Sequence, residues 1–177
     1  MIDMYYYEDM DKEIYTGKLA EYELLGEVLK KPEETLEYIP YRDAIEAIKK
    51  KQPWKDPTNP EKKFPNDLHK KIAAKLCPTN YKRLRFYTAV GSELDRFHGV
   101  DAFFELDFVE SEKIKTIRVT FDLTINPKKE EYKADELVFV PEEAIDFEEN
   151  LKEYEEVVSE AAKKISKIFE KKLKKEG

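Results

Sequence analysis

Cysteine and histidine are nearly absent from this sequence: its 177 residues include one cysteine, Cys77, and two histidines. A single cysteine excludes an intramolecular disulfide, and one cysteine with two histidines is too few for the common zinc sites built from these residues. Because disulfides are rare in reducing compartments, cysteine usage of this kind favours a cytoplasmic protein.

Long hydrophobic runs are missing as well. Apolar stretches such as residues 137–140 are only a few residues long, whereas a membrane-spanning helix needs about 20. The chain opens with Met1-Ile2-Asp3-Met4 instead of a basic leader, so we expect no signal peptide. With 41% hydrophobic and 12% aromatic residues, the sequence can bury a core, which predicts one soluble globular domain with appended helices.

Glutamine occurs once, at Gln52, while Lys and Glu supply most of the charge. Avoidance of heat-labile amides together with many ion-forming residues is typical of thermophilic proteins. This usage concerns habitat and carries no information about function.

The net charge of −7 is unevenly distributed along the chain. Residues 1–27 hold eight acids and two lysines, whereas residues 62–100 hold nine basic residues and three acids. The basic segment is a candidate surface for a polyanion such as DNA, with Lys70, Lys71, Arg83, Arg85 and Arg96 as the candidate contacts. The alternative is that its side chains are solvated and pair with the acidic N-terminal part.

The sequence divides into four segments, at residues 1–52, 53–65, 66–140 and 141–177. The first is predicted to be helical, because apolar residues recur at helix spacing from Leu19 to Leu29 and Pro32 is followed by two acids, as at a helix start. Three prolines within residues 52–60 predict that the second segment is a connecting loop.

The last segment, residues 141–177, is predicted to be an amphipathic helix. Asp146 and Glu149 have the spacing of a capping pair at its start. Apolar residues from Leu151 to Ile168 then recur every three or four positions and form a heptad-like seam. We expect the seam either to pack on the N-terminal helices or to form a homodimer.

Residues 66–140 are predicted to form an α/β core of the α+β class. A helix over 66–76, capped by Asn66 or Asp67, precedes strands over residues 83–90, 100–108 and 114–125. A hairpin turn is expected at 110–113, a short helix within 127–134 and a fourth strand over 136–140.

Two acids lie in apolar strands, where an ordinary core would exclude them. Asp101 opens the second strand and Asp122 lies within the third. In the simplest hairpin register the two are side by side, and adjacent carboxylates repel unless a cation bridges them or one is protonated. The alternative is that both are structural acids at the edge of the sheet.

This arrangement resembles the restriction-endonuclease-like, PD-(D/E)xK nuclease superfamily over about residues 66–140. In that superfamily an Asp starts the second strand of a meander that follows a helix, and the third strand carries an acid and, two residues later, a lysine. Asp101 and Asp122 match the two acids. Thr124 occupies the lysine position, so the resemblance implies that a lysine of the following segment, Lys129 or alternatively Lys128 or Lys133, supplies the ammonium group.

The resemblance implies a Mg²⁺- or Mn²⁺-dependent deoxyribonuclease in which Asp101 and Asp122 bind the metal, Lys129 assists catalysis, and Thr124 binds a water molecule. Asp95 and Glu105 are candidate additional acids, although Glu105 also fits a strand residue that faces solvent. The alternatives to an enzyme are a non-catalytic nucleic-acid-binding module on the same fold and a protein-interaction module.

Overall fold

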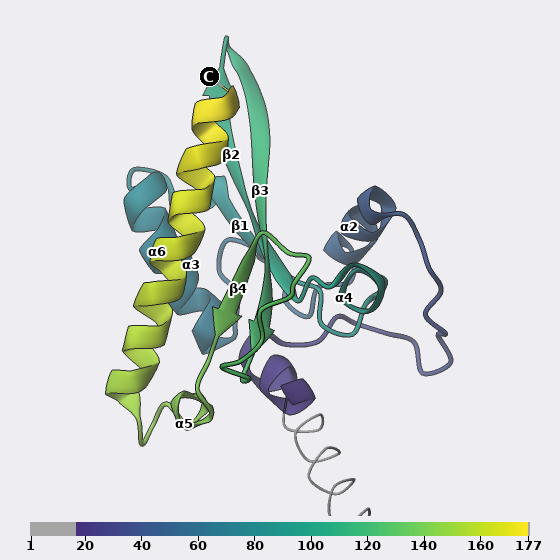
Figure 1. The fold of residues 1–177 in the computed structure, drawn as a ribbon. Coiled ribbons are helices and arrows are strands. Elements are labelled where there is room, and N and C mark those ends of the chain that lie inside the picture. The colour runs from purple at the N-terminus through teal and green to yellow at the C-terminus, as the bar shows by residue number, and fades with distance from the viewer. Residues whose placement is uncertain (1–16, 177) are drawn as a thin grey trace, which may run out of the picture.

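The structure, a computed structural model, describes residues 17–176. Its centre is a four-stranded mixed sheet in the order β1-β2-β3-β4, which makes the protein an α+β fold (Figure 1). The strands are β1 (Leu84–Thr88), β2 (Ala102–Glu110), β3 (Lys113–Thr124) and β4 (Glu136–Phe139). The helices are α2 (Tyr41–Lys49), α3 (Lys63–Leu76), the 3₁₀ helix η1 (Tyr81–Arg83), α4 (Glu93–His98), α5 (Glu142–Ile145) and α6 (Leu151–Glu176). Residues 17–25 are also helical.

The first three strands form an antiparallel meander, and β4 pairs parallel to β3. The β2–β3 hairpin turns at Ser111 and Glu112, both with positive φ (50° and 65°), the backbone that a two-residue type I′ turn requires. In the register that follows, Phe104 lies opposite Val119 and Ala102 opposite Phe121. The expected turn and all four expected strands are confirmed to within two residues at each end.

Helices α3 and α6 cover one face of the sheet, and α2 and α4 lie against the other (Figure 1). The larger core is on the α3 and α6 face, where Phe86, Phe104 and Phe121 pack ring against ring. The smaller core contains Ile45 of α2 and Phe103 of β2. Because side chains alternate between the faces of a strand, Asp101 and Asp122 fall on the face of the smaller core.

Helix α6 differs from the prediction in its start and in its packing partner. It begins at Leu151, and Asp146 instead ends α5. The seam residues Tyr154, Val158 and Ile165 are buried in the larger core with α3 and the sheet. The main partners of the seam are therefore α3 and the sheet, although Leu24 and Leu25 of the helix over residues 17–25 belong to the same core. These seam residues pack within the chain instead of being free for a partner helix.

Three other expectations are corrected. No helix starts at Pro32, because the chain from Lys31 to Pro40 is irregular and α2 begins at Tyr41. The segment 127–134 is irregular too: Thr124 and Asn126 accept hydrogen bonds from the backbone N–H groups of Asn126 and Lys128, which compete with helix formation. The sequence also predicts no helix between the first two strands, where α4 lies. The part of the 1–52 prediction on residues 1–16 lies outside the described residues.

The prediction of a Pro-rich connection is confirmed. Residues 53–62 form no helix or strand, and α3 begins at Lys63, a few residues before the expected cap. Trp54 from this connection is buried and stacks on Phe86, with ring centroids 5.9 Å apart. None of the helices in residues 17–176 has the length and the apolar character that crossing a bilayer requires.

Candidate metal centre

The structure places Asp101 and Asp122 side by side at one end of the β2–β3 pair. The backbone N–H of Asp101 donates to the Phe121 carbonyl (3.0 Å), and the Asp101 Oδ2 accepts from the Leu123 N–H (2.8 Å). Asp122 is the residue between Phe121 and Leu123, so these two hydrogen bonds place it next to Asp101. Both acids are buried, with exposed fractions of 2% and 7%, so they are not solvated acids at a sheet edge.

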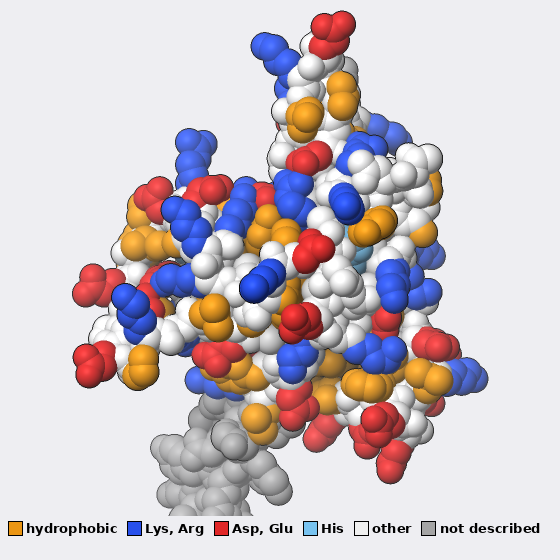
Figure 2. All heavy atoms as spheres, turned by 180° about the vertical axis from the view of Figure 1, so that it is seen from behind, with side chains coloured by type: hydrophobic (Ala, Val, Ile, Leu, Met, Phe, Trp, Pro, Cys, Tyr) orange, Lys and Arg blue, Asp and Glu red, His pale blue; other side chains and the backbone are white. Residues whose placement is uncertain are grey.

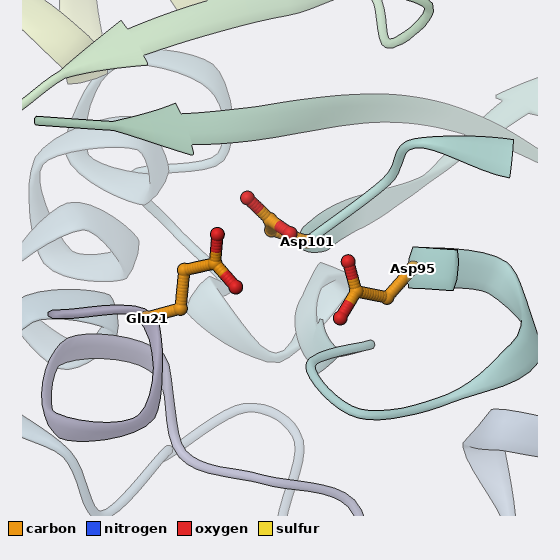
Figure 3. Close-up of side chains that lie close together, drawn as sticks. All are labelled: Glu21, Asp95 and Asp101. Atoms are coloured by element: carbon orange, nitrogen blue, oxygen red, sulfur yellow. The ribbon is translucent and has the colours of Figure 1, made fainter. Parts of the chain in front are cut away.

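Two more carboxylates converge on Asp101. Oxygen atoms of Glu21, Asp95 and Asp101 all lie within 4.8 Å of one another, and Figure 3 shows the three side chains pointing toward a common point from different elements. We call Glu21, Asp95, Asp101 and Asp122 the acidic centre. Asp95 was a candidate from the sequence, whereas Glu21 was not anticipated.

Helix α4 positions Asp95. The Ser92 hydroxyl accepts from the Asp95 N–H at the start of the helix, and Gly91, at φ 83°, donates its N–H to the Asp95 Oδ2 (2.9 Å). Gly99 ends the helix in the left-handed conformation, at φ 67°, which glycine adopts without steric cost. This ending turns the chain directly toward Asp101, so the short helix carries Asp95 and leads into a second acid of the four.

Glu21 comes from the helix over residues 17–25, far from Asp101 in sequence. Its neighbours at i+3 and i+4, Leu24 and Leu25, are buried, so Glu21 lies on the side of the helix that faces the core. The sequence does carry this signal, an acid in register with two core leucines. It could not show that this helix packs beside the start of β2.

The electrostatics of the acidic centre favour bound protons or a bound cation. Burial, with the negative charges of Asp95 and Asp122, raises the pKa of Glu21 to about 8. Burial also raises the pKa of Asp95 and holds the pKa of Asp101 well above its ordinary value. The nearby negative charges of Glu21, Asp95 and Asp122 add to this effect of burial at Asp101, and such raised pKa values favour protonated carboxyl groups. A divalent cation can replace such protons, because it stabilises the ionised forms.

In the part of the chain that the structure describes, Lys129 is the cation in direct contact with the acidic centre. Its Nζ lies 2.6 Å from the Asp122 Oδ2. Lys129, Glu21, Thr124 and Glu142 line a pocket of about 520 Å³ beside the acids. The structure therefore brings together Asp101, Asp122 and Lys129, and it places Thr124 at the pocket wall.

Glu105 lies away from the acidic centre. It is almost fully buried, at 2% exposure, and its carboxylate contacts Arg118 (2.7 Å) and Lys49 (2.8 Å). The expectation of a strand residue that faces solvent is wrong, because these cations compensate the buried charge. The same ion pairs hold the Glu105 carboxylate away from the candidate metal ligands.

The basic segment does not form one surface. Lys70 and Lys71 are exposed on α3, whereas Arg96 is exposed on α4, on the other side of the sheet. Arg85 forms a bidentate pair with Asp107 (2.6 and 2.9 Å), and Arg83 donates to the Asp107 carbonyl (2.8 Å). Figure 2 shows Lys and Arg interspersed with Asp and Glu, without a continuous basic field on that face.

Comparisons with models of protein families, with curated proteins and with solved structures find no match for this chain. The assignment of a role to the acidic centre therefore rests on its geometry, its electrostatics and the residue pattern of the sequence.

Proposed function

We propose that this chain is a Mg²⁺-dependent nuclease that hydrolyses phosphodiester bonds in DNA at the acidic centre. The observation that carries the proposal is the convergence of Asp101 and Asp122, from the ends of adjacent strands, with Lys129 in contact with Asp122. Glu21 and Asp95 complete a set of four carboxyl groups, and within residues 17–176 only one lysine contacts this set directly.

The order of the elements supports the proposal. A helix, α3, precedes an antiparallel meander of three strands, and a fourth strand pairs parallel to the third. This is the order that the resemblance to the restriction-endonuclease-like superfamily implies, except that the connection from β3 to β4 is irregular. Because that connection is irregular, Lys129 comes from a loop instead of a helix.

The donor set fits a hard divalent cation. Carboxylate oxygens are the ligands that Mg²⁺ and Mn²⁺ prefer, and at this site Glu21, Asp95 and Asp101 offer three of them. Bound there, the ion would polarise the scissile phosphate and lower the pKa of a water molecule.

The residues around the ligands have separate tasks. Asp122, which the resemblance suggests as a metal ligand, is instead assigned to holding the Lys129 ammonium group in place at 2.6 Å. Lys129 in turn orients the attacking water and offsets the negative charge that develops on the phosphate. Thr124, at the wall of the same pocket, offers a hydroxyl to a water molecule but cannot replace the charge of a lysine.

The direct test is cleavage of fluorescently labelled DNA in Mg²⁺, Mn²⁺ or EDTA. We expect cleavage that requires the metal, and we expect Asp101→Asn and Asp122→Asn to abolish it. Lys129→Ala should lower the cleavage rate by about 100-fold or more, whereas Lys128→Ala should leave it unchanged because Lys128 is exposed and does not line the pocket.

Failure of the wild-type protein to cleave single- or double-stranded DNA with either metal would refute the proposal. DNA binding without cleavage would then favour the non-catalytic nucleic-acid-binding module, since Thr124 already departs from the lysine of the superfamily pattern.

A further inference from the structure

Four aromatic rings gather where the start of α2 and the residues before it meet the end of α4. The Tyr38 ring centroid lies 5.8 Å from that of Phe97 and 5.5 Å from that of His98. Tyr41 approaches His98 at 5.6 Å. We call Tyr38, Tyr41, Phe97 and His98 the aromatic cluster.

The aromatic cluster leaves ring surface uncovered. Tyr38 is 65% exposed and Tyr41 is 42% exposed, although their segment is anchored by a contact of 2.8 Å between the His98 Nε2 and the Ile39 carbonyl. A tyrosine that served only as an anchor would bury its ring, as Trp54 does. The exposed rings are therefore available to another planar group.

Two cations flank the aromatic cluster. The Arg96 guanidinium lies over the Phe97 ring at 5.5 Å from the centroid, and Arg96 is exposed. Lys133 packs against Gly99 at the end of α4, since a Cβ added at Gly99 would lie 3.5 Å from the Lys133 Cβ. Lys133 is also exposed. Exposed rings flanked by cations suit a ligand that combines flat bases with a phosphate backbone.

The aromatic cluster is linked to the acidic centre by two short stretches of chain. On α4, Asp95 belongs to the acidic centre and Phe97, two residues later, to the aromatic cluster. On the β3–β4 connection, Lys129 contacts Asp122 and Lys133 packs beside the end of α4. Four residues span at most about 14 Å, so a strand held at the aromatic cluster can reach the acidic centre within a few nucleotides.

We propose that the aromatic cluster binds single-stranded DNA by stacking unpaired bases on Tyr38 and its neighbours, and delivers that strand to the acidic centre. This inference rests on the proposed nuclease function and names its substrate class. Bases within a duplex already stack on each other, so a duplex cannot offer its ring faces to the aromatic cluster. Stacking also predicts little dependence on base sequence, because every base has a flat face.

The test measures binding in EDTA, where no cleavage takes place. The probe is a fluorescein-labelled mixed-sequence oligonucleotide of about 20 nucleotides, single-stranded or annealed to its complement, and the readout is fluorescence anisotropy. We expect the wild-type protein to bind the single strand more tightly than the duplex, and Tyr38→Ala to weaken single-strand binding about 5- to 100-fold. Tyr38→Phe keeps the ring and should bind like wild type.

Tyr81→Ala is the matched control, because Tyr81 is an exposed tyrosine (54%) on η1, outside the aromatic cluster. Equal binding by wild type and Tyr38→Ala would overturn the proposal, and so would duplex binding as tight as single-strand binding or loss of binding in the Tyr81→Ala control. These outcomes are separate from the proposed hydrolysis: cleavage with unchanged Tyr38→Ala binding refutes only the stacking, and Tyr38-dependent binding without cleavage refutes only the nuclease.

Discussion

Removing the charge of Glu21 should make the metal-free protein less sensitive to alkaline pH. The pKa of Glu21 is raised from 4.5 to about 8 in the folded protein, so between these values the folded state holds a proton that the unfolded state has lost. Stability then falls as pH rises, until the folded protein also releases the proton near pH 8. Asp95 and Asp101, whose pKa values are also raised by burial, act in the same direction.

The expected magnitude follows from the pKa. Each pKa unit corresponds to about 1.4 kcal/mol, so the free energy of unfolding should fall by about 1–2 kcal/mol between about pH 6.5 and 9 on account of Glu21. Burial lowers the pKa of His69, and this makes the free energy of unfolding rise with pH, but only at pH values below about 6.5. Burial also raises the pKa of the Cys77 thiol, which contributes only near pH 9, so the difference between wild type and a Glu21 variant isolates the effect of Glu21.

The assay is urea unfolding in EDTA at several pH values, followed by circular dichroism, for wild type and Glu21→Gln. We expect the free energy of unfolding of the wild-type protein to decline as pH rises, and that of Glu21→Gln to change less with pH. Mg²⁺ should stabilise the wild type more at high pH than at low pH, because the ion competes with bound protons. A wild-type stability that is flat or rises over this window, or an equal decline in Glu21→Gln, would refute the electrostatic account of the acidic centre.

Two further predictions concern the sheet. Glu105→Gln leaves Lys49 and Arg118 without their buried counter-charge and should lower the free energy of unfolding by about 2–3 kcal/mol in urea titrations. DNA cleavage by the folded variant should persist. A change in the free energy of unfolding below experimental error would show that the ion pairs of Glu105 add nothing to stability. In the β2–β3 turn, Ser111→Asn combined with Glu112→Gly suits the two positive φ angles and should raise the free energy of unfolding by about 0.5–1 kcal/mol in thermal or urea melts, whereas a loss would contradict the assigned turn.

The strands were predictable from the sequence because their signal is local. Alternation in β3 and the short polar turn before it define both the strand limits and the register, and the register alone predicts that Asp101 meets Asp122. The irregular connection after β3 was not predictable from the number of residues available for a helix. The hydrogen bonds to Thr124 and Asn126 that prevent the helix depend on how the backbone leaves the sheet. The short helix α4 was missed because its polar composition matches that of a loop.

The candidate site was predictable only in part, for a related reason. Asp101 and Asp122 share one hairpin, so their proximity follows from local pairing. Glu21 reaches the same point from a helix about 80 residues earlier in the chain, and such a contact depends on tertiary packing that no periodicity encodes. Glu105 illustrates the reverse error, because its partner Lys49 likewise comes from a distant helix.

The central claim is that the acidic centre binds a divalent cation, and Mn²⁺ binding measured by isothermal titration calorimetry tests it most directly. The comparison needs wild type, Asp101→Asn and, as a matched control, Glu160→Gln, an exposed acid on α6 in the pocket beside β4. We predict saturable Mn²⁺ binding with proton release in wild type and Glu160→Gln, and loss of that binding in Asp101→Asn. No saturable binding by wild type, or equal binding by Asp101→Asn, would contradict the account.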